Sequence, residues 1–168
     1  MVGYHATPFV MAKKILKSGV IKRTNHDNML YTDTTRGFVH LATNFKCAMD
    51  FGIRAVGHAR NNSITEDGHI VVFKVELHIE TQFFDDPDEL SGVDTGDVLE
   101  NIGITNTFRV SKDLVLGEEV TSYLPLKLDR NTEIIWRYYD QGRFDEAELF
   151  HYWKPCNSVR TNRSAHEF

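Results

Sequence analysis

Two histidines occupy matching positions in two short apolar segments of the sequence. His5 lies within Val2–Thr7 and His40 within Phe38–Thr43, and a helix-like segment follows each of them. A neutral imidazole donates one hydrogen bond and accepts another, so it can hold a polar ligand from within a strand. A buried ring without a partner is costly. Each histidine therefore needs either a ligand or a partner in the core, such as a backbone carbonyl.

Two carboxylate pairs are the other candidate reactive groups. Asp85 and Asp86 stand directly before Pro87, and Glu118 and Glu119 stand directly before an apolar run. A carboxylate that lies beside a reacting centre stabilises positive charge that develops there. Each pair also has a structural interpretation, because aspartates before proline form self-bonded turns and paired glutamates are common at strand edges.

Other reactive side chains have spacings that do not indicate a site. His58, His69 and His78 lack the spacing that would place zinc ligands on one face, so we expect no metal. Cys47 lies on a predicted helix face, and the sequence places no base beside it, which favours a packing role. With Cys156 as the second cysteine of the chain, a disulfide framework is not expected, and a reducing cytoplasm fits.

Composition and charge limit the class of protein. The chain has 168 residues, of which 41% are hydrophobic and 26% charged, which is typical of one soluble globular domain. A formal net charge of -5 disfavours broad binding to nucleic acid backbones. No segment resembles a signal peptide or reaches membrane-spanning length, so we expect a cytoplasmic protein with no membrane partner.

Two strand-then-helix units must position the histidines. Thr7 is predicted to cap the first helix, with Pro8 at its first position, and Gly19 is predicted to end it. Thr43 or Asn44 is predicted to cap the second helix. The predicted strands are Val2–Thr7, Val20–Ile21, Phe38–Ala42, His69–Leu77, Thr107–Val110, Glu119–Pro125, Glu133–Tyr139 and Phe144–Lys154.

The pattern of these elements predicts a small α+β domain with two early helices followed mostly by strands. His69–Leu77 is the strongest strand and is expected to be central. The acidic stretch 83–97 is predicted to be a loop, the region 101–107 has no clear assignment, and a polar loop covers 22–37. There is no GxGxxG or P-loop motif. We expect one domain over residues 1–156 and a polar tail over residues 157–168.

The order of these segments resembles that of ADP-ribosyltransferase-fold proteins, and is most similar to the rifamycin ADP-ribosyltransferase family. The likeness covers about residues 3–125 and implies an α+β fold with a split β-sheet and two early helices. Its motifs are Tyr4-His5-Ala6-Thr7 with Ser18-Gly19-Val20, then Phe38–Thr43, then Gly68–Glu76 with Phe84-Asp85-Asp86-Pro87, and last Thr107–Val120.

The resemblance implies a role in NAD binding for the first two motifs. The family's first-strand histidine, which hydrogen-bonds the adenosine ribose of NAD, falls on His5. Ala6 replaces a glycine whose backbone grips the nicotinamide amide, and Thr7 follows it. His40 stands where the family has a tyrosine that stacks on nicotinamide, so its ring is expected to contact the same group.

The resemblance also implies a catalytic carboxylate. In the rifamycin group this position falls on Asp85 or Asp86, whereas in the wider superfamily it falls on Glu119 or Glu118. Cleavage of the nicotinamide–ribose bond passes through an oxocarbenium-like state, which a nearby carboxylate stabilises. The implied activity is a glycosyltransferase reaction that moves ADP-ribose from NAD, as co-substrate, to an acceptor.

The acceptor stays open, as a small molecule, a protein or a nucleic acid. Two alternatives remain beside this activity. Val39-His40-Leu41 is similar to a motif of RNA 2'-phosphotransferases of the same fold. Ala6 and His40 depart from the family pattern, which fits a non-catalytic module that binds NAD or ADP-ribose.

Overall fold

The computed structural model describes residues 1–24, 36–61, 69–90, 92–127 and 152–156. This part of the chain combines helices with a six-stranded sheet and a separate two-stranded sheet, which confirms the α+β prediction. The strands are β1 Val2–Pro8, β2 Val20–Ile21, β3 Val39–Ala42, β4 His69–Glu76, β5 Thr107–Val110, β6 Leu114–Val115, β7 Val120–Lys127 and β8 Lys154–Pro155. The helices are α1 Phe9–Ser18, α2 Phe45–Asn61 and α3 Val98–Thr105. None of these three helices is long and apolar enough to cross a membrane.

The larger sheet has the strand order β5-β3-β1-β4-β7-β8, with antiparallel pairing throughout. β4 lies in the middle, and its residues Val71, Val72 and Phe73 are completely buried, as its apolar sequence predicts. β1 pairs with β4 along its whole length, but with β3 only where Tyr4 faces Ala42. The ladder between β1 and β3 therefore ends at this pair.

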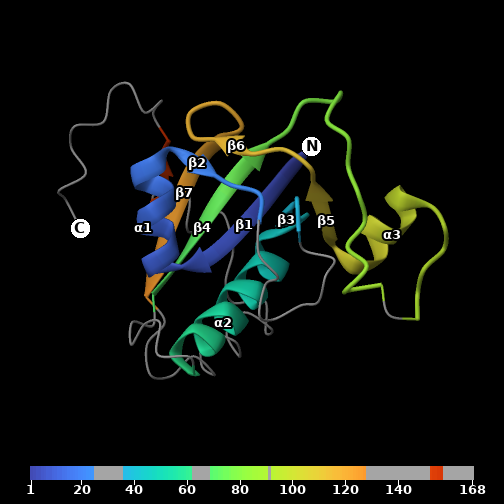
Figure 1. Cartoon of the computed structure of the whole chain (residues 1–168), viewed down its shortest axis with the longest axis horizontal. Coiled ribbons are helices and arrows are strands. Elements are labelled where there is room, and N and C mark those ends of the chain that lie inside the picture. The colour runs from blue at the N-terminus through green and yellow to red at the C-terminus, as the bar shows by residue number, and fades with distance from the viewer. Residues whose placement is uncertain (25–35, 62–68, 91, 128–151, 157–168) are drawn as a thin grey trace.

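Side-chain alternation along the strands divides the interior into two cores, one on each face of the sheet. The α1-side core contains Ala12 of α1 together with Phe73 and Phe108. The α2-side core contains Phe45 and Met49 of α2 together with further apolar residues of β1, β3, β4 and β7. Figure 1 shows α1 and α2 as separate helices packed against the sheet.

The helix ends agree in part with the predicted caps. Gly19 adopts the left-handed conformation at φ 74°, which suits glycine, and its N–H bonds to the Ile15 carbonyl at 2.8 Å. Asn44 caps α2, because its Oδ1 accepts the Cys47 N–H at 2.9 Å. The Thr7 cap was wrong: Thr7 belongs to β1, its side chain is buried in the sheet, and α1 follows Pro8 without a side-chain cap.

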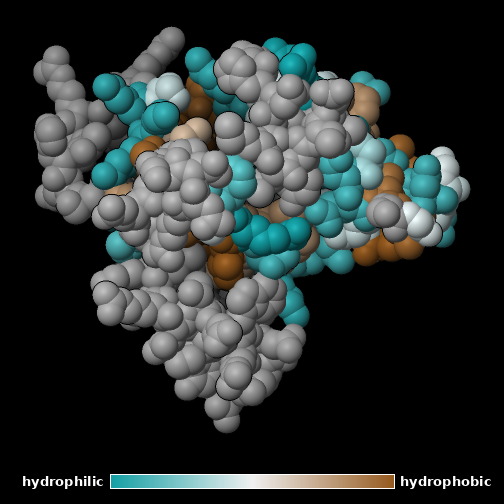
Figure 2. All heavy atoms as spheres, turned by 60° about the horizontal axis from the view of Figure 1, so that its bottom comes forward, coloured by the Kyte–Doolittle hydropathy of each residue, from teal (hydrophilic) through white to brown (hydrophobic). Residues whose placement is uncertain are grey.

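Two elements were not predicted. β6 lies between the predicted strands Thr107–Val110 and Glu119–Pro125. α3 begins directly after the acidic stretch 83–97 and extends into the unassigned region 101–107. α3 is anchored by two buried residues, Asn101 and Ile102, while Leu99 and Ile104 stay exposed. Brown atoms at the right-hand edge of Figure 2, where α3 lies, show this apolar outer face. The predicted strand Glu133–Tyr139, residues 144–151 of the last predicted strand and the tail lie outside the described residues.

The first turn of α3 depends on Asp97. Its Oδ1 accepts the N–H groups of Leu99 and Glu100 at 2.9 and 3.0 Å. We expect Asp97→Ala to lower the free energy of unfolding by about 1 kcal/mol, because both amides lose this acceptor. Asp97→Asn is the matched control, since it keeps an oxygen acceptor and is expected to retain most of the stability. Chemical denaturation measures both, and equal stability of wild type and Asp97→Ala would contradict the cap.

Candidate functional site

The side chain of His5 contacts the backbone of His40 at the point where β1 and β3 separate. Its Nδ1 lies 3.1 Å from the His40 carbonyl oxygen. Because a carbonyl only accepts, Nδ1 must carry the proton and donate this hydrogen bond. The two segments with the predicted histidines are therefore joined directly.

The two imidazole rings nevertheless lie on opposite faces of the sheet. His5 pairs in register with Phe73, and the two ring centroids are 6.5 Å apart, on the α1 side. His40 alternates with Val39 and Leu41, which both belong to the α1-side core, so its own side chain projects toward the α2 side. The histidines thus meet only through the His40 carbonyl.

Ala6 and Thr7, the other residues expected to bind NAD, are divided between the same two faces. Ala6 packs on the α2-side core, and its Cβ is 3.0 Å from the position that a Cβ on Gly52 would take. Thr7, only 8% exposed, is on the α1 side by alternation. A single ligand at His40 can therefore reach side chains on the α2 side and the backbone of the strands, but not the side chains on the α1 side.

Asp86 is the partner of the His40 side chain. His40 Nδ1 lies 2.8 Å from Asp86 Oδ2, and the aspartate is only 5% exposed. The other oxygen, Oδ1, accepts the Asp88 N–H at 3.3 Å. The second ring nitrogen of His40, Nε2, is buried and has no hydrogen-bond partner among the described residues. Unpaired buried polar atoms are rare in folded proteins, so Nε2 is a candidate for contact with a ligand.

Arg109 holds the chain segment that carries Asp86. Phe84 and Arg109 exchange two backbone hydrogen bonds of 3.0 and 2.7 Å. The Arg109 Nε donates to the Asp85 carbonyl at 2.8 Å, and its guanidinium lies 4.2 Å from the centre of the Phe38 ring. Arg109 was not predicted from the sequence, although a charged residue within the strand 107–110 was an available signal.

Asp85 faces away from this site. Its Oδ2 accepts from Asn101 Nδ2 at 2.9 Å. Asn101 is 1% exposed, and its amide also bonds Asp94 and Thr95. The adjacent aspartates are thus in different environments: Asp85 anchors α3, and Asp86 supports His40. Asn101, too, was not identified from the sequence.

The glutamate pair belongs to another part of the molecule. Glu119 accepts hydrogen bonds from the Lys112 side chain and, at 3.0 Å, from the Val115 N–H. Burial raises the pKa of Glu119, but the hydrogen bonds from Lys112, Val115 and its own backbone, with the charge of Lys112, outweigh burial and the net shift is downward. Glu118 is exposed in the same turn. The structure does not bring either glutamate to His40, and Glu119 connects β6 to the loop that carries Lys112.

Burial lowers the pKa of His5, although the His40 carbonyl opposes this shift and the His40 side chain adds to it. His5 is therefore neutral in the folded protein at neutral pH. Because the unfolded chain binds this proton more readily, we expect stability to be full above the ordinary histidine pKa of about 6.5 and to fall as pH drops below it.

Unfolding free energies measured across that pH range test this expectation. His5→Gln keeps a donor for the carbonyl but removes the titrating ring, so it should flatten the decline. A decline of the same steepness in His5→Gln would mean that other groups cause it, and His78→Gln, at an exposed position, is the matched control.

The two cysteines are unsuited to nucleophilic chemistry. Burial raises the pKa of Cys47 to about 11, with further upward shifts from Asp50 and Glu89. Burial raises the pKa of Cys156 to about 12. Since the thiolate is the reactive form, both thiols are inert at neutral pH. Among the described residues, no group of three or more His, Cys, Asp or Glu side chains is arranged to hold a metal ion.

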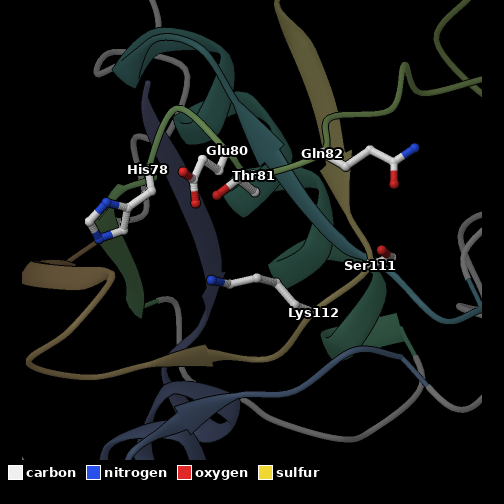
Figure 3. A pocket seen from close by; sticks show the side chains of 6 residues that line it. All are labelled: His78, Glu80, Thr81, Gln82, Ser111 and Lys112. Atoms are coloured by element: carbon white, nitrogen blue, oxygen red, sulfur yellow. The ribbon is translucent and has the colours of Figure 1, made fainter.

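A polar cavity of about 370 Å³ lies away from these residues. It is lined by His78, Glu80, Thr81, Gln82, Ser111 and Lys112. Figure 3 shows these side chains on the segment that follows β4 and on the loop that follows β5. The cavity includes none of His5, His40 and Asp86, and its Lys112 is already paired with Glu119. It is therefore separate from the histidine site.

Comparisons with known proteins give little further information. No family model matches the sequence, and no curated protein matches it. Among solved structures, the chain is similar to heat-labile enterotoxin, in an arginine-to-lysine variant described for the flexibility of an active-site loop in its A subunit. This similarity covers 74% of this chain and 67% of that chain, with 11% identity and a TM-score of 0.44. It transfers no residue role, so the site depends on the geometry above.

Proposed function

We propose that this protein is an NAD-dependent ADP-ribosyltransferase, which transfers ADP-ribose from NAD to an acceptor and releases nicotinamide. The observation that carries the proposal is the hydrogen-bonded series His5, His40 and Asp86. These residues come from three of the four segments in which the sequence resembles that enzyme class. They meet beyond the point where the pairing of β1 and β3 ends. There, a ligand can approach the backbone of both strands.

In this proposal, Asp86 is the carboxylate that stabilises the positive charge developing in the reaction. It is buried and contacts His40, whereas Asp85 bonds Asn101 and Glu119 bonds Lys112. A buried carboxylate acts in a low-dielectric surrounding, where its effect on developing positive charge is larger than in water. We assign the backbone of Ala6 and Thr7 to the adjoining wall for the ribose and nicotinamide groups. His5 lies on the opposite face and supports this wall through the His40 carbonyl.

The chemistry requires no further cofactor than NAD as co-substrate. The bond between the ribose carbon and the nicotinamide nitrogen breaks, and nicotinamide leaves with the bonding electrons. The sugar carbon passes through an oxocarbenium-like state and then bonds to the acceptor. The acceptor remains a small molecule, a protein or a nucleic acid, of which the net charge of -5 least favours nucleic acid.

The test is to incubate the protein with NAD and candidate acceptors and to measure nicotinamide release and NAD affinity. Release that exceeds the rate without protein supports the proposal, and His78→Ala at an exposed position is the control that should retain it. NAD binding without nicotinamide release would instead indicate a non-catalytic binding module. If the protein neither binds NAD nor releases nicotinamide, the proposal is overturned. Activity on 2'-phosphorylated RNA in its place would indicate a phosphotransferase.

A further inference from the structure

We infer that His40 and Asp86 form an acid–base dyad, in which His40 Nε2 takes the proton from the nucleophile that attacks the sugar carbon. This inference rests on the proposed function and changes the part that each residue plays. His40 is the catalytic base, not only a flat surface for nicotinamide. Asp86 is a positioning residue that acts through His40.

The hydrogen bond between Asp86 and His40 determines which ring nitrogen can accept a proton. A carboxylate only accepts, so His40 Nδ1 must carry the proton in the 2.8 Å contact with Asp86 Oδ2. In the neutral ring, the lone pair is then on Nε2, which points away from Asp86. Nε2 is the atom that is buried without a partner. A ligand hydroxyl that donates to Nε2 would satisfy it.

The surroundings of Asp86 limit how it can act. Its two oxygens are engaged by His40 and by the Asp88 N–H, and its side chain is 7% exposed. Direct contact with a sugar would have to break one of these bonds. Support of a protonated His40 needs no such rearrangement, because the existing contact becomes a charge-assisted hydrogen bond when the ring gains its proton.

Several charged or titratable groups of the described elements lie around the dyad. Arg109 of β5 is the register partner of His40, and His5 of β1 bonds the His40 carbonyl. Glu89 lies near Asp86, and Arg54 of α2 comes within 4.0 Å of Glu89. Burial and the acidic neighbours raise the pKa of Glu89, while Arg54 lowers it. A control for Glu89 is therefore needed in any pH measurement.

The proposed step balances in atoms and charge. The hydroxyl oxygen of water or of the acceptor forms a bond to the ribose carbon as the bond from that carbon to the nicotinamide nitrogen breaks. Neutral nicotinamide departs with the electron pair. The hydroxyl proton passes to His40 Nε2, and the imidazolium later releases it to solvent. NAD and the hydroxyl compound are the only reactants, and no oxidant or reductant takes part.

The experiment compares nicotinamide release by wild type and by His40→Gln between about pH 5 and pH 9, with NAD affinity measured for both. A base must be neutral, so the wild-type kcat should fall on the acidic side. This fall of kcat toward low pH is the acidic limb of the pH profile. His40→Gln should bind NAD, lose about 100-fold or more in kcat, and lack the acidic limb. His78→Gln and Glu89→Gln are the controls that should keep the limb. Added imidazole should partly restore His40→Ala.

The outcomes separate the dyad from the proposed function. If wild type releases nicotinamide but His40→Gln keeps the rate or the acidic limb, the dyad is overturned and the function stands. If Glu89→Gln removes the limb, the titrating base is not His40 and the inference is also overturned. If wild type neither binds NAD nor releases nicotinamide, both the function and the dyad fail. Circular dichroism verifies that each variant is folded.

Discussion

Replacing Asp86 with asparagine is expected to slow nicotinamide release by about 100-fold or more while leaving NAD affinity within a few-fold of wild type. Asparagine preserves the shape of the side chain and can still accept from His40 Nδ1. It removes the negative charge that stabilises the His40 ring when the ring takes a proton. Because that charge matters only after proton transfer, kcat should fall and KM should change little.

Asp85→Asn is the matched control for this measurement. It is the adjacent residue with the same chemical change, but its carboxylate bonds Asn101 and not His40. We expect its turnover to remain close to wild type, with any loss confined to stability. Full turnover in Asp86→Asn, together with loss in Glu119→Gln, would transfer the carboxylate role to the β6–β7 region and contradict the assignment.

Replacing Phe73 with alanine is expected to lower the free energy of unfolding by about 3–5 kcal/mol. Phe73 is completely buried in the central strand β4, and its ring packs beside those of His5 and Tyr123. The substitution removes buried apolar surface and leaves a cavity between β1 and β7. Since domains of this size are stabilised by about 5–15 kcal/mol, a large share of the total would be lost.

Urea denaturation of Phe73→Leu and Ile79→Ala provides the comparison. Leucine fills part of the space, so we expect its loss to be clearly smaller than that of alanine. Ile79 is 95% exposed, so Ile79→Ala should remain within about 0.5 kcal/mol of wild type. A loss below about 1 kcal/mol in Phe73→Ala would show that β4 is not the centre of the core.

Several local elements of this protein follow from the sequence alone. Apolar β-branched residues predicted β4, and the helical spacing of apolar residues with Gly19 predicted α1 and its end. These features depend on neighbouring residues and on backbone preferences, which are properties of short segments. α3 was not predicted, because only two of its residues, Asn101 and Ile102, are buried. Its apolar residues therefore do not follow the spacing of a helix that packs along one face.

The candidate site, in contrast, was only partly determined by the sequence. The segments with His5 and His40 could be identified, but the face of each ring depends on how β1 and β3 pair, which no single strand encodes. The choice among Asp85, Asp86 and Glu119 likewise depended on contacts across the chain. Asp86 reaches His40 because the Phe84–Arg109 pairing carries its segment along β5. Tertiary structure decided this, because hydrogen bonds between residues distant in sequence form only once the sheet is assembled.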